Sequence, residues 1–578
     1  MIKRVFGAPE TAVPSAFCPG LRYEEGPVRY DLSRIAFRTT ARGCLLELPL
    51  EEEEQIYGLG LQLKSFNHRG KKLTLRVNAD PAAPTGDSHA PVPFFVSTKG
   101  YGVYLDTARY IEVYAGVRRR GDSRGRAGDG RVRTSTDELY AAREEAGPSV
   151  LLVEIPAAKG VTLYLMEGKT ITEVVSQYNR LAGGGCSVPA WGLGPLYRCY
   201  SRLTGGQVLR QARYFRERDI PCSILGLEPG WQSQTYSCSF TWDAERFPDP
   251  DGLIRRLRED GFHVNLWEHA FTHPSSPLYE TMRRGGGDYE VWNGAVPDFA
   301  SGAVREAFAG YHRERFVERG VDGFKLDECD GSDYTGGWSF PNGSQFPSGL
   351  DGEQMHGLFG TLYMQTMLQA LDGVPTLSQV RSAGALAAPY PFVLYSDLYD
   401  HRDFIRGCAS AGFSGLLWAP ELRHAVSRGD LLRRLQTAVF SVQCVINAWY
   451  CEEPPWLAFD CEDEVRDLLK ARERLVPLLL EAFEDYRRTG KPPVRALVSD
   501  YTDDPATYEI DDQYLLGDLV VAPMTAEQTE RSVYLPEGRW RDWWTGRRVE
   551  SGRFTAAGDR IPVYERIPER PAACSAAE

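Results

Sequence analysis

The N-terminal part of the chain alternates apolar and polar residues in short pieces that are separated by glycine and proline. Pieces of this kind predict half-buried β-strands bounded by turns. They lie at residues 43–50, 73–77, 102–106 and 150–155. The pattern continues to about Glu167 and predicts an N-terminal β-sandwich.

After a helical segment at residues 170–181, continuous apolar runs alternate with amphipathic stretches. Continuous apolar runs predict strands that are buried on both faces, as in a parallel sheet. Eight such strands are predicted, at residues 194–200, 222–228, 263–269, 323–328, 376–381, 392–397, 415–418 and 445–450. Helices are predicted between several of them, at residues 206–218, 252–260, 304–319 and 401–411. Eight strand–helix units within about 250 residues predict a (β/α)8 TIM barrel.

From about Lys491 the chain returns to short strands and turns, for example at residues 517–523 and 533–540, which predicts an all-β module. The expected fold class is therefore multidomain, α/β and β. We expect an N-terminal β-sandwich at residues 1–168, a central barrel at 169–487 and one or two C-terminal β-modules at 488–578. A length of 578 residues agrees with several domains.

Charge and composition narrow the classes of partner. A net charge of −13 disfavours nucleic acids and anionic membranes, because binding to their phosphates needs clustered cations. The chain has neither a signal-like apolar segment near Met1 nor a run of about 18 apolar residues. Its 12 cysteines include no C-x-x-C pair, so neither a zinc ribbon nor a dense disulfide framework is predicted. We expect a cytoplasmic protein without a metal or other cofactor; a homo-oligomer is left open.

Two of the predicted barrel strands end on a carboxylate. The fourth apolar run leads to Asp327 and the sixth leads to Asp397. Barrel enzymes place their active sites at the C-terminal ends of the strands, so this pair predicts acid/base and nucleophilic chemistry on a sugar. The alternative for both acids is a helix N-cap at a strand–helix turn.

Motifs in all three regions resemble, in the same order, those of glycoside hydrolase family 31, the retaining α-glucosidases and α-xylosidases. The sandwich has Tyr-Gly-Leu-Gly at 57–60, Asn-His-Arg-Gly at 67–70 and Pro-Phe-Phe-Val-Ser-Thr-Lys-Gly-Tyr-Gly at 93–102. The barrel has Phe-Thr-Trp-Asp at 240–243, Arg-Phe-Pro-Asp-Pro at 246–250, Asp-Phe at 298–299 and Gly-Phe-Lys-Leu-Asp-Glu at 323–328. The last region has Asp-Pro-Ala-Thr-Tyr at 504–508 and Tyr-Leu-Pro-Glu-Gly at 534–538.

The resemblance implies a nucleophile at the fourth strand and an acid/base at the sixth, which are Asp327 and Asp397. It also implies an arginine at the fifth strand, which is Arg381. The residue pattern agrees, because a cation between the two acids would keep Asp327 ionised. A rim salt bridge without catalytic effect is the alternative for Arg381.

Further candidates for sugar binding lie near the strand ends. Glu228 stands where the family usually has an aspartate that binds sugar hydroxyls. The rings of Trp231 and Trp267 are candidates to pack on the C–H face of a sugar, with packing at the barrel rim as the alternative. Strand alternation places Lys325 beside Asp327, on the face opposite Glu328. Glu328 either binds a hydroxyl or pairs with a cation.

One departure from the family bears on the substrate. Relatives usually carry His-Asp-Ile-Gly-Gly after the seventh strand, whereas this chain has Trp-Ala-Pro-Glu-Leu-Arg at 418–423. The family's sugar-binding histidine is missing, and Glu421 and Arg423 are candidates to replace its hydrogen bonds. Trp418 remains a candidate at this rim. An α-galactoside or a modified hexose is therefore an alternative to an α-glucoside.

The expected reaction is exo-cleavage of a terminal α-glycoside with retention, on a small carbohydrate substrate. Transglycosylation on the same residues is an alternative. A metal-dependent hydrolase with Glu268, His269 and His273 as ligands is a weaker alternative, because no second histidine pair accompanies them. His269 is better interpreted as lining the sugar pocket. A non-catalytic sugar-binding protein is also an alternative, although both carboxylates are present.

Overall fold

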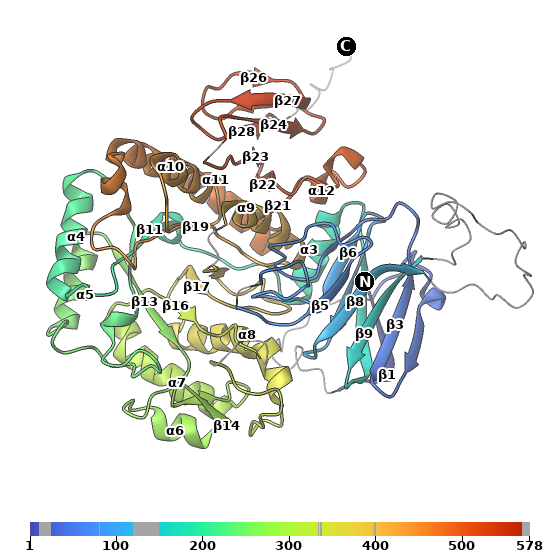
Figure 1. The fold of residues 1–578 in the computed structure, drawn as a ribbon, viewed down its shortest axis with the longest axis horizontal. Helices are drawn as coiled ribbons and strands as arrows, with labels where there is room; N and C mark the ends of the chain where they lie inside the picture. The colour runs from blue at the N-terminus through green and yellow to red at the C-terminus, as the bar shows by residue number, and fades with distance from the viewer. Residues whose placement is uncertain are drawn as a thin grey trace, which may run out of the picture.

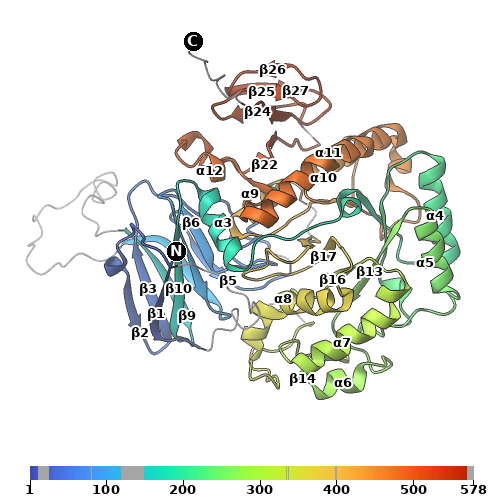
Figure 2. The ribbon, with the colours of Figure 1, turned by 180° about the vertical axis from the view of Figure 1, so that it is seen from behind.

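The computed structural model describes residues 1–10, 25–79, 81–118, 149–332, 335, 338–397, 400–526 and 528–568. Figures 1 and 2 show three parts: a β-sandwich in blue, a barrel in green to orange, and a small β domain in red. The sandwich lies beside the barrel, and the red domain lies against the barrel helices near the C-terminus. This arrangement confirms the predicted fold class.

The N-terminal domain consists of two five-stranded antiparallel sheets. One sheet has the order β1 (Ile2–Ala8), β10 (Lys159–Glu167), β7 (Tyr101–Asp106), β6 (Phe94–Ser97) and β4 (Ile56–Gly58). The other has the order β2 (Ala36–Thr39), β3 (Gly43–Pro49), β9 (Ser149–Pro156), β8 (Ile111–Arg118) and β5 (Lys72–Leu75). In β8, buried and half-buried residues alternate, because one strand face lies on the core between the sheets.

The barrel is formed by an eight-stranded parallel sheet. Its order is β18 (Phe392–Leu394), β17 (Ser378–Val380), β16 (Gly323–Asp327), β13 (His263–His269), β12 (Ile224–Leu227), β11 (Pro195–Arg198), β20 (Cys444–Asn447) and β19 (Glu421–Leu422). The longer helices of this part are α3 (Ile171–Leu181), α4 (Gly205–Glu217), α5 (Pro250–Glu259), α7 (Gly302–Arg315), α8 (Gly352–Leu371), α9 (His401–Ser410), α10 (Arg428–Val439) and α11 (Glu462–Thr489). A short helix, α6 (Tyr279–Arg284), and a hairpin of β14 (Gly286–Val291) and β15 (Gly294–Pro297) lie between β13 and α7.

Local sequence explains where several of these helices begin. Helix α4 follows Thr204, whose side chain forms a capping box with Gln207. Helix α5 begins at Pro250, directly after the N-cap Asp249, which accepts a hydrogen bond from the Gly252 amide. These capping residues set the N-terminal ends of the two helices that follow the first two strands of the barrel.

The seventh strand differs from its predicted position. Residues 415–418 form no regular strand; Trp418 makes a single bridge to Leu394, and the strand β19 follows at Glu421–Leu422. Pro420 separates the two pieces and has no amide hydrogen to continue the ladder. The bridge on one side and β19 on the other nevertheless join the two edges of the sheet into a barrel.

The described part of the C-terminal domain is mainly β-structure, with the one-turn helix α12 (Leu497–Asp500) and a 3-10 turn at Pro505–Thr507. Its larger sheet contains β21 (Val494–Ala496), β22 (Tyr514–Leu516), β23 (Leu519–Val521), β28 (Val563–Arg566), β25 (Trp540–Asp542) and β26 (Arg548–Val549). A separate hairpin pairs β24 (Glu530–Leu535) with β27 (Gly552–Ala557). Strands β21 and β22 contact α9 of the barrel.

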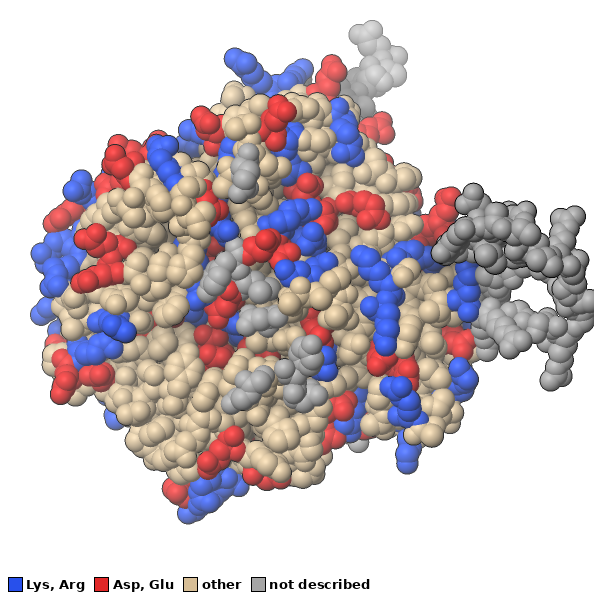
Figure 3. Space-filling view, viewed as in Figure 1, with Lys and Arg blue, Asp and Glu red and all other residues tan. Residues whose placement is uncertain are grey.

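Within the described residues, none of the helices has the length and apolar character needed to cross a membrane. On the face shown in Figure 3, acidic and basic side chains are interspersed. That face therefore has no large area of a single charge sign.

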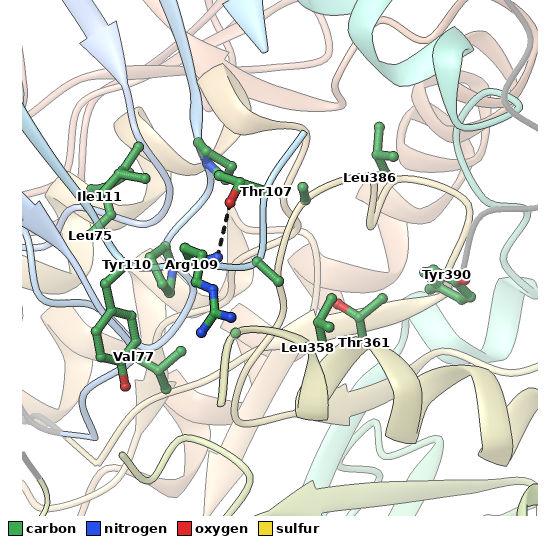
Figure 4. Close-up of a pocket in the computed structure, with 15 residues that line it drawn as sticks. Leu75, Val77, Thr107, Arg109, Tyr110, Ile111, Leu358, Thr361, Leu386 and Tyr390 are labelled. Carbon is green, nitrogen blue, oxygen red and sulfur yellow. Dashed lines mark hydrogen bonds between the residues drawn. The ribbon is translucent and has the colours of Figure 1, made fainter. Parts of the chain in front are cut away.

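A small cavity of about 50 Å³ marks the seam between the sandwich and the barrel (Figure 4). Leu75 and Ile111 of the sandwich lie on one side, and Leu358 of α8 lies on the other. At its edge the Arg109 amide donates a hydrogen bond to the Thr107 hydroxyl. None of the described carboxylates lines this cavity.

Candidate active site

The barrel brings the two predicted carboxylates to one guanidinium group. Asp327 ends β16, Asp397 follows β18, and Arg381 follows β17, which lies between those strands. Arg381 Nη1 lies 3.7 Å from Asp327 Oδ1 and 2.5 Å from Asp397 Oδ2. These two oxygens are therefore no more than about 6 Å apart, below the ~6.5–9.5 Å that inverting glycosidases need.

Asp327 is buried and held from two sides. Trp267 of β13 donates its indole hydrogen to Asp327 Oδ2 at 2.7 Å, and the Glu328 amide donates to Oδ1 at 2.9 Å. Burial acts to raise the Asp327 pKa, but the positive charges of Arg381 and Lys325 outweigh it and keep the pKa below its usual value. The carboxylate is thus ionised and fixed in direction, as a nucleophile requires.

Asp397 is engaged by two arginines. Arg381 contacts its Oδ2 and Arg423 contacts its Oδ1. Burial opposes ionisation, but Arg381 and then Arg423 hold the Asp397 pKa far below its usual value. Its side chain remains 40% exposed, whereas that of Asp327 is 10% exposed. The acid/base candidate therefore faces the open side of the site.

A buried ion cluster lies next to the carboxylate pair. Glu228, which follows β12, accepts hydrogen bonds from Arg198 at 3.0 Å and from Lys325 at 3.2 Å. Arg198 also donates to Gln379 at 2.7 Å and to Asn265 at 2.8 Å. Buried charges of this kind persist only when they are paired and hydrogen-bonded. Sequence reasoning found Glu228 and Lys325 but missed Arg198, although a cation at the end of a buried strand is itself a signal.

Glu328 is the protonated acid of the site. Burial, with the neighbouring Asp327 as the next cause, raises the pKa of Glu328 to about 9. The Tyr236 hydroxyl donates a hydrogen bond to Glu328 Oε1 at 3.1 Å. The backbone of Glu328 has φ 51°, in the left-handed region, which turns its side chain away from the strand direction. Glu328 therefore contributes a neutral carboxyl at neutral pH.

We expect Glu328→Gln to raise stability at pH 8 and to leave it unchanged near pH 4. The unfolded chain ionises this carboxyl above about pH 4.5, whereas the folded chain keeps it protonated up to about pH 9. The wild type therefore loses stability between these two pH values, and the amide removes that loss. Chemical unfolding at both pH values should show a gain on the order of 1–3 kcal/mol at pH 8 only. Equal gains at both pH values would contradict the assignment.

Two further predicted site residues are buried beside the carboxylates. Burial lowers the pKa of His269 to about 4, so its imidazole is neutral at physiological pH. Glu421 of β19 accepts a hydrogen bond from Asn447 at 2.9 Å, and burial raises its pKa. Both side chains have polar atoms suited to hydrogen bonding with sugar hydroxyls.

Two of the predicted tryptophans lie in the core. Trp231 is fully buried, donates its indole hydrogen to the Trp267 carbonyl at 2.7 Å and packs on Trp242. Trp418 is also buried and donates to the Phe404 carbonyl at 3.1 Å. These contacts agree with the packing alternative, and a role of the two rings in sugar binding stays a prediction.

The weaker alternative of a metal site finds no support in the described residues. No group of three or more His, Cys, Asp or Glu side chains there is arranged to hold a metal ion. Glu268 instead pairs with His312 at 3.1 Å and accepts a hydrogen bond from Tyr363 at 2.7 Å.

A histidine of the N-terminal sandwich completes the site. His89 lies between β5 and β6; its Nδ1 is 2.8 Å from Asp330 Oδ2 and its Nε2 is 2.7 Å from Ser396 Oγ. Asp330 in turn accepts a hydrogen bond from Arg381 Nε at 2.8 Å. His89 and Asp330 thereby fix the arginine that contacts both carboxylates. Sequence reasoning missed His89, and no local pattern around it pointed to the barrel.

Comparison with known proteins gives the family. Residues 186–482, more than half of the chain, match the family model described as "Glycosyl hydrolases family 31 TIM-barrel domain". Residues 36–113 match the family's N-terminal galactose mutarotase-like domain, and residues 490–567 match its C-terminal domain. The chain belongs to glycoside hydrolase family 31. The predicted family and the predicted class of enzyme, a glycoside hydrolase, are confirmed.

Individual family 31 relatives are similar over most of this chain. It is 26% identical to an α-xylosidase of Emericella nidulans, over 90% of this chain and 67% of the relative. It is 25% identical to α-glucosidase 2 of Bacillus thermoamyloliquefaciens, over 92% of this chain and 68% of the relative. The chain thus spans about two-thirds of the length of these relatives. These α-glycosidase relatives confirm the predicted reaction class, which is that of an α-glycosidase.

A solved family 31 structure shares the fold. The dextranase of Flavobacterium johnsoniae, complexed with glucose, superposes with a TM-score of 0.78 at 20% identity, covering 93% of this chain and 68% of that chain. At this identity the likeness concerns the fold alone.

Proposed function

We propose that this family 31 protein is an exo-acting retaining α-glycosidase, in which Asp327 is the nucleophile and Asp397 is the acid/base. The observation that carries the proposal is the shared contact of both carboxylates with Arg381 Nη1. Their short separation leaves no room for a water molecule between sugar and carboxylate, so Asp327 attacks the anomeric carbon directly.

The reaction proceeds in two displacements. In the first, a carboxylate oxygen of Asp327 forms a bond to the anomeric carbon, the bond to the leaving oxygen breaks, and Asp397 gives that oxygen a proton. In the second, Asp397 takes a proton from water, the water oxygen bonds to the anomeric carbon, and the bond to Asp327 breaks. The sugar leaves with the configuration that it had in the substrate.

The sugar-binding groups in this proposal are those beside the carboxylate pair. They are Glu228, Trp267, His269, Lys325, Glu328, Arg381, Glu421 and Arg423, with Arg198 added by the structure. The buried cations and acids provide donors and acceptors for several hydroxyls, which supports a polar hexose. An α-galactoside or a modified hexose remains an alternative to an α-glucoside.

Transglycosylation is the second candidate activity, because one curated relative is an isomaltosyltransferase of Sporosarcina globispora. That match has 21% identity, over 88% of this chain and half of the relative. The same covalent intermediate would then pass to a sugar hydroxyl instead of water. A cytoplasmic location stays a prediction, and a homo-oligomer stays open.

The test is release of 4-nitrophenol from a panel of 4-nitrophenyl α-glycosides: glucoside, galactoside, xyloside, N-acetylgalactosaminide and quinovoside. We expect turnover of one of these sugars, with proton NMR showing the α-anomer of the free sugar before mutarotation. An initial β-anomer would refute retention, and no release from any sugar by the folded protein would refute the proposed function. Disaccharide products at high substrate concentration would identify the transferase.

A further inference from the structure

Both oxygens of the Asp397 carboxylate are taken by guanidinium groups. Arg381 Nη1 lies 2.5 Å from Oδ2, and Arg423 Nη1 contacts Oδ1. A carboxylic acid that protonates a leaving oxygen needs one of its own oxygens to carry the hydrogen toward the substrate. In this arrangement each oxygen already accepts from a guanidinium group, so both contacts favour the ionised carboxylate over the protonated acid.

The groups that face Asp397 come from several strands. They are Lys325 and Asp327 of β16, Arg381 after β17, Tyr395 after β18, Glu421 of β19 and Arg423 after β19. Burial opposes the charge on Asp397, but the cations Arg381, Arg423 and Lys325 together keep its pKa well below the usual value. Proton donation at neutral pH therefore requires that one of these cations move away.

Arg381 is not the cation that can leave. Its Nε donates to Asp330, which His89 contacts from the sandwich, and its Nη1 also faces Asp327. Moving Arg381 would take one cation away from Asp327, Asp330 and Asp397 at once, which is unfavourable for buried carboxylates.

Arg423 is placed differently. It follows the two-residue strand β19, at the start of the segment that leads to α10. The ring of Trp449 lies 5.1 Å from its guanidinium carbon while Nη1 contacts Asp397, so the ring stabilises the same charge from another side. Its contact with Asp397 is on a carboxyl group whose side chain is 40% exposed. Arg423 also occupies the rim where this chain departs from the family's usual motif.

We propose that Arg423 is a positioning residue that keeps Asp397 ionised in the free enzyme and is displaced from Oδ1 when the glycoside binds. This inference rests on the proposed function. On displacement, Oδ1 takes up a proton from solvent, and that proton is the one passed to the leaving oxygen. Arg423 thereby couples sugar binding to the protonation of the acid/base.

The kinetic test compares two pH profiles on the aryl α-glycoside that the panel selects. The pH at which kcat/KM falls on the alkaline side (its alkaline limb) reports the pKa of the acid in the free enzyme. The corresponding pH for kcat reports the pKa of the same acid in the enzyme–substrate complex. In the wild type we expect the kcat/KM limb to lie at least about one pH unit below the kcat limb. Arg423→Gln removes the cation, so its kcat/KM limb should move up toward the kcat limb. Arg258→Gln, which breaks an ion pair with Asp322 at 2.7 Å, is the matched control and should move neither limb.

A second measurement reads Asp397 without turnover. Protein labelled with [γ-¹³C]aspartate is titrated by NMR, and the Asp397 signal is assigned by its loss in Asp397→Asn. The Asp397 pKa should be well below the ordinary value in the wild type and should rise by about one unit or more in Arg423→Gln.

Coincident limbs in the wild type, or an Asp397 titration that Arg423→Gln does not shift, would overturn the inference. Absence of turnover on the whole panel would refute the proposed function instead. In that case the NMR titration decides by itself whether Arg423 holds Asp397 ionised.

Discussion

Asp327→Ala should lower kcat by about 10³–10⁵-fold on every aryl α-glycoside that the wild type cleaves, without unfolding the protein. The alanine removes the oxygen that bonds to the anomeric carbon, while Trp267 of β13 and Arg381 after β17 remain. Release of 4-nitrophenol, with circular dichroism as the check on folding, measures the effect. Asp322→Ala, at the opposite end of the same strand region, is a control in which an aspartate paired with Arg258 is removed.

Adding azide to Asp327→Ala tests whether Asp327 is the nucleophile. With Asp327→Ala, azide can enter on the face that the carboxylate occupied and displace the leaving group in one step, which gives a β-glycosyl azide from an α-glycoside. Recovery of rate with this product supports Asp327 as the nucleophile. Near-native turnover of Asp327→Ala without azide would remove Asp327 from that role.

Asp397→Ala should give a loss that depends on the leaving group. A poor leaving group such as a second sugar needs its oxygen protonated, so its cleavage should fall by about 10²–10⁴-fold. A 4-nitrophenyl glycoside needs little protonation, so its first step should persist and a burst of 4-nitrophenol should precede a slow steady state. Rapid-quench kinetics on both substrates measures the difference.

Azide again identifies the role, and with the opposite stereochemistry. In Asp397→Ala it attacks the covalent intermediate on Asp327 without needing a general base, so the product should be an α-glycosyl azide. The same loss on both leaving groups, with no product from azide, would show that Asp397 is not the acid/base. The two variants thus check each other. If the roles of Asp327 and Asp397 were interchanged, each variant would give the opposite anomer of the glycosyl azide.

Much of the fold could be predicted because its signals are local. Alternation at residues 150–155 and continuous apolar runs such as 392–394 are set by which strand faces are buried. The seventh strand was misplaced, because the apolar run at 415–418 looks like the others. There the Leu394 amide donates to the Leu417 carbonyl at 2.8 Å and the Ala419 amide donates back to Leu394, but Pro420 ends that pairing.

Site residues could be predicted only where a side chain suited to the reaction lies at the end of a predicted strand. Asp327 ends a barrel strand, Arg381 and Glu228 directly follow one, and Asp397 lies three residues after β18, which is a pattern visible in one chain. Trp231 has the same local signal, yet its ring packs inward, because side-chain direction depends on contacts that sequence spacing does not fix. The Asp397–Arg423 pair depends on closure of the barrel between β18 and β19.

His89 has a consequence for how this enzyme can be rebuilt. The residue that steadies Arg381, through Asp330, belongs to the sandwich and is 241 positions away from Asp330 in the chain. The barrel is therefore not a self-sufficient module, and a chimaera that joins it to the sandwich of another relative must bring a partner for Asp330. To exchange substrate specificity between such enzymes, the barrel must therefore be transferred together with the loop between β5 and β6 of its own sandwich.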